Sequence, residues 1–296
     1  MAPRSVSGFV ERVDAWQQKR TVAGFFVAVG AKYRDDRGQQ YAALLSYYGF
    51  ISMFPLLLAF VSILSIVLKN EPTARDKIIN GLIGRLPVIG TQIKTDTSSM
   101  QVHGVLVVIG IATLLWAGLK VVRNAQNAFN EQWGVPYLER PGVVRQSIRG
   151  LAMLAVIGLA IVGATAVTSL AAFGDFPGLT RVTGAFVAIL LNIVLLGVSF
   201  ELLTEARLGV RTLLPGAVLG GVGLWAVQLV GGTYIERVVA DASDIYGAFA
   251  TVFGLLIWLA LLARVVLIAN EMNVVLRRHA WPRTFRRSAT VRPPEE

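Results

Sequence analysis

The sequence contains no cysteine, and its only histidines are His103 and His279. The absence of cysteine excludes disulfide bonds, thiol chemistry and cysteine-based metal clusters. The motifs HExxH, GxxxxGK[ST] and GxSxG do not occur either. A metal-dependent nuclease or an ATP-driven pump would therefore lack its usual ligands. The sequence predicts a protein that is not an enzyme and that needs no cofactor or metal.

Charged residues are scarce as well, at 16% of the chain, while 54% of the residues are hydrophobic and the mean hydropathy is +0.61. A soluble domain carries about 25% charged residues to cover its surface. Here the charge sits at the ends of the chain and in short connections, and long stretches have almost none. A membrane-spanning helix needs about 20 mostly apolar residues. The composition therefore predicts an all-α, polytopic membrane protein.

Acidic residues are outnumbered: the chain has 18 Asp and Glu but 28 Lys and Arg, which gives a net charge of +10. In a soluble protein this excess would point to nucleic acid. Here the arginines border apolar segments, so membrane topology and the anionic headgroups of lipids account for them more simply. We expect membrane lipids as partners and no nucleic acid, and a homo-oligomer is compatible with the sequence.

The apolar segments predict about six transmembrane helices between short or polar connections. Residues 1–41 form a basic N-terminal arm, 42–276 the transmembrane domain, and 277–296 a basic tail. Within the arm, residues 6–34 have apolar residues at helical spacing, but the uninterrupted apolar run is too short to cross the membrane. This pattern predicts an amphipathic helix. That helix either lies on the headgroups or packs against the ends of the spans. A second short amphipathic helix, either interfacial or re-entrant, is predicted at 73–87. The spans are predicted at 42–68, 102–122, 150–172, 182–203, 212–234 and 247–274.

The distribution of Lys and Arg predicts the orientation, because cytoplasmic loops are enriched in them. If the N-terminus is inside, the inner segments hold 20 of these residues and the outer segments 7, with Arg264 inside a span. Both termini are therefore expected on the cytoplasmic side.

Polar side chains at membrane depth are costly and mark candidate functional positions. Arg264 lies in the sixth predicted span, with Glu271 two turns further on, and Glu201 and Asn192 lie on the fourth. Together they suggest a polar inner vestibule that could contact a lipid phosphate or another anion. The structural alternatives are that Arg264 extends to the interface or pairs with Glu201, and that the remaining groups are ordinary polar helix ends.

Further candidates lie on the first two spans. Pro55 removes one backbone hydrogen bond beside Tyr47 and Tyr48, and broken helices often line transport sites, although kinks also occur without them. Arg123 and Asn127 share a helical face beyond the second span, either as a headgroup-binding face or as a solvated stripe. In the fifth span, a GxxxG formed by residues 216–220 predicts close helix packing rather than chemistry.

Three segments, taken together, resemble the YihY/BrkB family of bacterial envelope proteins. They are AALLSYYGFISMFPLLLAF (Ala42–Phe60), LLWAGLKVVRNAQNAFNEQWGV (Leu114–Val135), and the stretch Leu213–Leu276 with LLPGAVLG, Tyr246–Gly247 and ANEMNVVL. The ANEMN ending departs from the more usual GAELN, and the long basic arm is most similar to the YhjD-like branch. The resemblance implies a six-span protein of the bacterial cytoplasmic membrane that is associated with envelope integrity. It also implies the former label ribonuclease BN, against which the missing metal ligands argue.

These observations favour a protein that binds or translocates a lipid or another amphipathic anionic substrate. The alternative is a membrane scaffold that recruits envelope partners through the basic arm and tail. A membrane-bound hydrolase would require a nucleophile–base pair that the sequence does not offer.

Overall fold

The computed structural model describes residues 21–67, 104–171, 177–206, 208–234 and 248–281, and every regular element in these ranges is helical. The α-helices and one 3-10 turn are α2 (Thr21–Asp35), α3 (Gly38–Val67), α6 (Gly104–Gln132), η1 (Tyr137–Glu139), α7 (Val143–Ala171), α8 (Pro177–Leu203), α9 (Val210–Tyr234) and α11 (Ala248–Arg278).

Each of the six predicted spans coincides with one long helix. Within the described residues, α7, α8, α9 and α11 are long and apolar enough to cross a membrane. The protein is therefore an all-α membrane protein, while the crossing of α3 and α6, and with it the count of six, stays a prediction. Helix α7 begins at Val143, earlier than the start predicted for the third span at residue 150, because the helix starts directly after Pro141 and Gly142. The predicted helix at 73–87 and the outer parts of the arm and tail lie outside the described residues.

Three of the described helices are followed by a residue with positive φ, namely Arg37 after α2, Gly134 after α6 and His279 after α11, and the last two form matching turns. At the end of α6, Gly134 has φ 67°, its N–H binds the Glu131 carbonyl at 2.9 Å, and the next N–H, of Val135, binds the Asn130 carbonyl at 2.8 Å. This is the Schellman arrangement, which favours glycine. At the end of α11 the same position is held by His279, with φ 48°. Both turns lie where α2, α6 and α11 meet.

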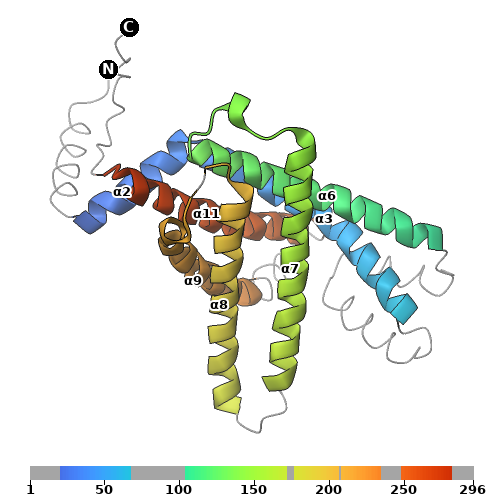
Figure 1. The fold of residues 1–296 in the computed structure, drawn as a ribbon. Coiled ribbons are helices and arrows are strands. Elements are labelled where there is room, and N and C mark those ends of the chain that lie inside the picture. Colours follow the sequence, from blue (N-terminus) through green and yellow to red (C-terminus); the bar gives the residue numbers. More distant parts are fainter. Residues whose placement is uncertain (1–20, 68–103, 172–176, 207, 235–247, 282–296) are drawn as a thin grey trace.

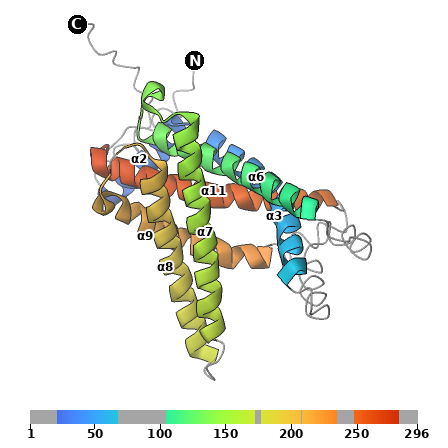
Figure 2. The same cartoon turned by 45° about the vertical axis from the view of Figure 1, so that its right-hand side comes forward.

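The helices converge at one end of the molecule and spread at the other (Figures 1 and 2). Helices α7 and α8 form a long antiparallel hairpin, and α3 and α6 form a second pair that leaves the centre in a different direction. Helix α11 packs against both α3 and α9, and α2 lies on α11 near the end where the pairs meet. The predicted amphipathic helix thus packs against the spans over the residues that are described.

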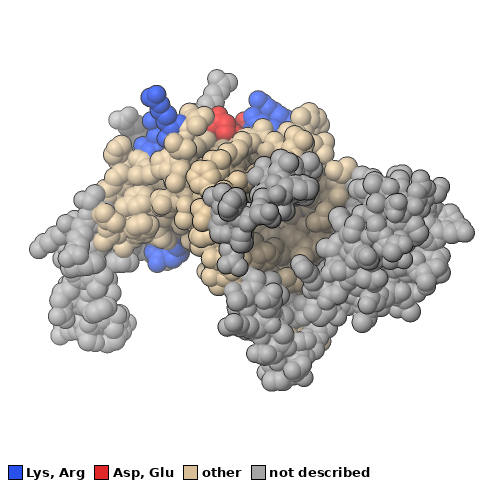
Figure 3. All heavy atoms as spheres, turned by 90° about the horizontal axis from the view of Figure 1, so that it is seen from below, with Lys and Arg blue, Asp and Glu red and all other residues tan. Residues whose placement is uncertain are grey.

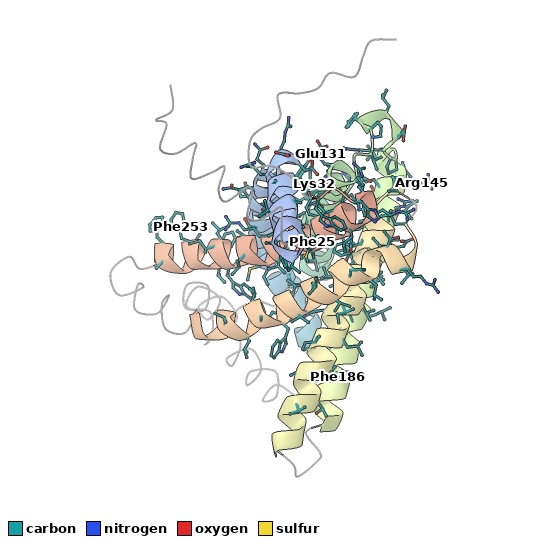
Figure 4. All side chains as sticks on the ribbon, turned by 90° about the vertical axis from the view of Figure 1, so that its left-hand side faces the viewer. Phe25, Lys32, Glu131, Arg145, Phe186 and Phe253 are labelled. Atoms are coloured by element: carbon teal, nitrogen blue, oxygen red, sulfur yellow. The ribbon has the colours of Figure 1, made fainter. Side chains whose placement is uncertain are left out.

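Buried side chains concentrate at the convergent end. Phe129 of α6 and Phe200 of α8 pack edge to face there, with ring centroids 5.3 Å apart, beside Leu267 of α11. The described surface seen from the other end is mostly neither acidic nor basic (Figure 3). Among the labelled side chains, Lys32, Glu131 and Arg145 gather at the convergent end, while Phe186 and Phe253 lie far out on α8 and α11 (Figure 4).

Helix α9 packs closely between α11 and α8 because it presents glycines to both. A Cβ on Gly216 would lie 2.6 Å from the side-chain amide of Asn273 and closer still to the backbone of α11. On another face of α9, a Cβ on Gly221 would lie 2.6 Å from Ile193 of α8. Small residues allow two helix backbones to approach in this way. The packing role predicted for the GxxxG is confirmed.

Candidate functional site

The polar segment of α11 at residues 270–273 is completely buried, with Asn270, Glu271 and Asn273 all at 0% exposure. On a helix, consecutive residues point in different directions. Three buried polar side chains within one turn can be accommodated only where neighbours surround the helix. Helices α2, α6 and α9 provide these neighbours, and each polar side chain contacts a different one. The segment therefore joins helices and is not the polar interfacial end that the sequence allowed.

Asn270 binds α11 to the end of α6. Its amide nitrogen donates to the Gln132 side-chain oxygen at 2.6 Å, and its own oxygen accepts from the Trp133 indole at 3.2 Å. The Gln132 amide in turn donates to the Leu267 carbonyl at 3.0 Å. Because all of these groups are buried, each lost hydrogen bond would leave a polar atom without water to replace it.

Asn273 binds α11 to α9. Its side-chain oxygen accepts a hydrogen bond from the backbone N–H of Gly216 at 2.7 Å. That N–H lies in the first turns of α9, directly after Pro215, and the glycine permits the approach of the amide. The GxxxG of α9 and the ANEMN segment of α11 thus contact each other, through Gly216 and Asn273.

Glu271 faces α2, where its counter-charge is Lys32. The Lys32 ammonium lies 3.5 Å from a Glu271 carboxylate oxygen, donates to the Gln132 carbonyl at 2.9 Å and also pairs with Asp36. Lys32 is itself buried (Figure 4 shows its position at the convergent end). Neither Glu271 carboxylate oxygen has a hydrogen-bond donor among the described residues, so the attraction of Lys32 is what opposes the cost of burying this group. The pair fastens the arm helix to the transmembrane helices.

Arg264 lies two turns outward on α11 and is exposed, beside Tyr33 of α2. Burial raises the pKa of the Tyr33 hydroxyl above its usual value, and the positive charge of Arg264 opposes that rise. Glu201 instead lines a pocket between α8 and α9. The structure therefore does not bring Arg264, Glu201 and Glu271 into one vestibule, because α11 directs the first and third toward α2 while Glu201 belongs to a different surface.

The pocket that contains Glu201 is an apolar groove between α8 and α9, with a volume of about 540 Å³. This size lies within the range of small-molecule sites, about 300–1,000 Å³. Two charged residues lie among its lining, Glu201 of α8 and Arg149 of α7, and Arg149 forms an ion pair with Glu205 just beyond α8. The remaining lining residues are Ile193, Val194, Gly197, Val198, Leu202, Val210, Leu213, Leu214 and Ala217.

The polar face beyond the second predicted span holds α6 to α7. The Arg123 guanidinium donates to the Ser147 hydroxyl at 2.6 Å, and Asn127 accepts from the Gln146 amide at 3.4 Å. Glu131, on the same face, pairs with Arg140 at 2.8 Å. These contacts give the face a structural role in positioning the start of α7, where Arg149 lies.

The other predicted positions lie apart from the groove mouth. The Asn192 amide of α8 donates to the Gln228 oxygen of α9 at 3.3 Å, which is a polar contact between two spans. Tyr47 and Tyr48 pack edge to face on α3 with centroids 5.2 Å apart, and Pro55 lies within that helix. Among the described residues, no group of three or more His, Cys, Asp or Glu is placed to hold a metal ion.

Sequence reasoning missed Lys32 and Arg149 as site residues, since it counted both only as markers of orientation. Each had a visible signal: Lys32 lies on the apolar face of a predicted amphipathic helix, and Arg149 opens a span. Their partners, Glu271 and Glu205, are too distant in sequence for spacing to reveal.

Helix content, apolar spans and buried interhelical polar groups define a multi-pass α-helical membrane protein. Residues 29–291 match the family model described as virulence factor BrkB, so the chain belongs to the BrkB family. It is similar to the inner membrane protein YhjD of Escherichia coli strain K12, with 21% identity covering 84% of this chain and 80% of that protein. It is also similar to a ribonuclease-like protein, YfkH, of Bacillus subtilis strain 168, with 20% identity covering 86% and 95%.

A UPF0761 membrane protein of Laribacter hongkongensis strain HLHK9 is 26% identical over 86% of this chain. The chain spans about three fifths of that protein, since 61% of its length is covered. No solved structure matches this chain. The resemblance inferred from the three sequence segments is confirmed.

Proposed function

We propose that this protein is a non-enzymatic component of the bacterial inner membrane that binds and moves a lipid or a similar amphipathic molecule, and that it thereby supports the integrity of the envelope. The observation that carries the proposal is the apolar groove between α8 and α9. Both helices are candidate spans, so the groove lies where acyl chains are available. Its charged residues, Glu201 and Arg149, lie at the convergent, basic end, where headgroups of the inner leaflet would be.

Acyl chains fit the groove for a physical reason. A ligand pocket at a membrane helix that is lined almost wholly by aliphatic side chains offers dispersion contacts but few hydrogen bonds. Such a surface favours a long apolar chain over a polar metabolite. The charged mouth then orients the chain with its polar end inward.

The proposal is tested by reconstituting the purified chain in liposomes that contain a fluorescent phospholipid and measuring its movement between leaflets. Val194→Trp places a bulky side chain in the groove and is expected to abolish the protein-dependent part of the rate. Leu190→Trp, one turn outward on the same helix and not part of the groove lining, is the matched control and should retain it. Equal rates with protein-free liposomes for the unmodified chain would overturn the proposal.

A scaffold remains the second candidate because η1 presents Tyr137 and Leu138 to solvent, the latter at 96% exposure, at the convergent end. Such exposed apolar side chains are typical of contact sites for other proteins. A scaffold requires that Leu138→Ser, which removes the exposed apolar side chain and leaves the Lys32–Glu271 pair intact, abolishes the envelope phenotype while Val194→Trp leaves it intact. The lipid proposal requires that Val194→Trp alone abolishes it.

A further inference from the structure

Among the described residues, the mouth of the groove carries charges of both signs. Arg149 and Glu201 line it, Glu205 pairs with Arg149, and Arg145 lies close enough on α7 to act on Arg149 electrostatically. The two charged residues that line the groove, Arg149 and Glu201, therefore have opposite signs and make its mouth dipolar. The excess of arginine in the whole sequence, which favours an anionic ligand, is therefore not what the groove itself presents.

Glu201 is the carboxylate available to a ligand. Glu205 is partly buried and engaged with Arg149, whereas Glu201 is exposed on α8, and no ion pair joins it to another part of the described chain. An anionic headgroup in the groove would meet this negative charge and be repelled by it. A headgroup with its own positive charge would be attracted.

Arg149 can bind a phosphate without giving up Glu205. Its Nη1 nitrogen contacts the Glu205 carboxylate, and a guanidinium carries five N–H donors in a planar fork. Guanidinium groups favour phosphate oxygens because two donors reach two acceptors at once. The groove thus offers an acyl-chain surface, a phosphate donor and a free carboxylate in one place.

We infer that the groove recognises a phosphoethanolamine headgroup, with the phosphate at Arg149, the primary ammonium at Glu201 and the acyl chain along Val194, Gly197 and Ala217. This inference rests on the proposed function and specifies its substrate class. A primary ammonium donates hydrogen bonds to a carboxylate. The quaternary ammonium of choline has no N–H to donate, and phosphatidylglycerol has no cation.

The test measures which lipids copurify with the full chain from an equimolar mixture of phosphatidylethanolamine, phosphatidylcholine and phosphatidylglycerol with identical acyl chains, by native mass spectrometry. Phosphatidylethanolamine is expected to be enriched about three- to fivefold over the other two, the size of a solvent-accessible ion-pair contribution. Glu201→Gln, a nearly isosteric change at an exposed site, should lower that enrichment to about one while the total amount of bound lipid stays the same.

Two controls separate the possible failures. Glu139→Gln removes an exposed carboxylate on η1, away from the groove, and should leave the enrichment unchanged. Val194→Trp should reduce all three lipids alike, and its failure to do so would overturn the groove itself as a lipid site. If Val194→Trp reduces binding but the unmodified chain shows no preference, or Glu201→Gln does not alter that preference, the headgroup inference is wrong while the proposed function stands.

Water-soluble glycerophosphoethanolamine should not displace the lipid, because it lacks the acyl chain. Its displacement of the lipid at equal concentration would overturn the inference that the acyl chain contributes to binding.

Discussion

The Lys32–Glu271 pair shows how much a single buried charge can require of its surroundings. Both side chains are removed from water, and Lys32 has two carboxylates and one backbone carbonyl as partners. Desolvation of two ions opposes the pair, while their attraction and the additional hydrogen bonds favour it. Its net contribution to stability is therefore small, but the cost of breaking it from one side is large. The pair is better explained as a fixed attachment of α2 than as a source of stability.

This asymmetry makes a testable prediction. Lys32→Met should leave the Glu271 carboxylate buried and unpaired and should lower the free energy of unfolding by about 3–5 kcal/mol. The double change of Lys32 and Glu271 to Met should restore most of that loss, because the fully buried carboxylate is then gone and Asp36, the other partner of Lys32, is partly exposed to water. Thermal unfolding of the detergent-solubilised protein measures both.

Arg34→Met, an exposed cation on the same helix, is the control and should alter the melting temperature little. A double variant that is less stable than Lys32→Met would contradict the explanation, since it would show that the pair itself stabilises the fold.

At the scale of the helices, the sequence was sufficient to locate six long elements because apolar runs and their polar breaks are local signals. The polar helical extension predicted beyond Val122 is present, since α6 continues to Gln132, but the sequence did not show its cause, which is that Gln126, Asn130 and Gln132 find buried partners. No local pattern distinguishes such side chains from a solvated stripe. Their roles depend on partners 20 residues away for Gln126, 75 for Asn130 and 138 for Gln132.

The same limit explains the candidate vestibule. Glu201, Arg264 and Glu271 were grouped because each is polar at a similar membrane depth. Depth follows from position along a span, whereas the direction in which a side chain points follows from which helix lies beside it. Only the packing order of α2, α11, α9 and α8 separates Arg264 from Glu201. The sequence could therefore suggest a shared depth for these residues, but it could not show in which direction each side chain points.

The contact between α9 and α11 supplies a prediction at this scale. Gly216→Ala introduces a Cβ that collides with the backbone of α11 and with Asn273, so the two helices must separate and the 2.7 Å hydrogen bond to Asn273 must lengthen. The melting temperature should fall by several degrees, consistent with a loss of about 1–3 kcal/mol from overpacking.

Gly184→Ala on α8 is a matched control, because no atom lies within 4 Å of its added Cβ. There the change should be neutral or should stabilise the helix slightly, since alanine favours helix more than glycine does. Equal losses at the two positions would show that helix propensity, and not close packing, determines the effect.

At the scale of the whole molecule, the convergent end combines the packed core, the interhelical polar network and most of the described charges, while the far ends of the helix pairs are apolar and spread apart (Figures 1 and 4). On the proposed function, the separation of the outer helix ends leaves room for lipid to approach from the side. The groove mouth lies at the packed end, where Arg149 is fixed by its ion pair with Glu205, so a headgroup would meet a positioned side chain while the acyl chain stays in contact with the bilayer. This division fits a lipid-handling protein better than a sealed pore.

The orientation and the number of crossings can be tested together because the chain has no native cysteine. Single cysteines at Ser5, Ser99 and Leu138 stand before α3, between α3 and α6, and after α6. If both helices cross, a membrane-impermeant maleimide added to intact spheroplasts labels Ser99→Cys alone, and permeabilisation exposes the other two. If neither crosses and only the four candidate spans do, all three positions respond alike. Labelling of Ser5→Cys and Leu138→Cys in intact spheroplasts, with Ser99→Cys protected, would reverse the orientation inferred from 20 inner against 7 outer basic residues and would place the groove mouth at the outer leaflet.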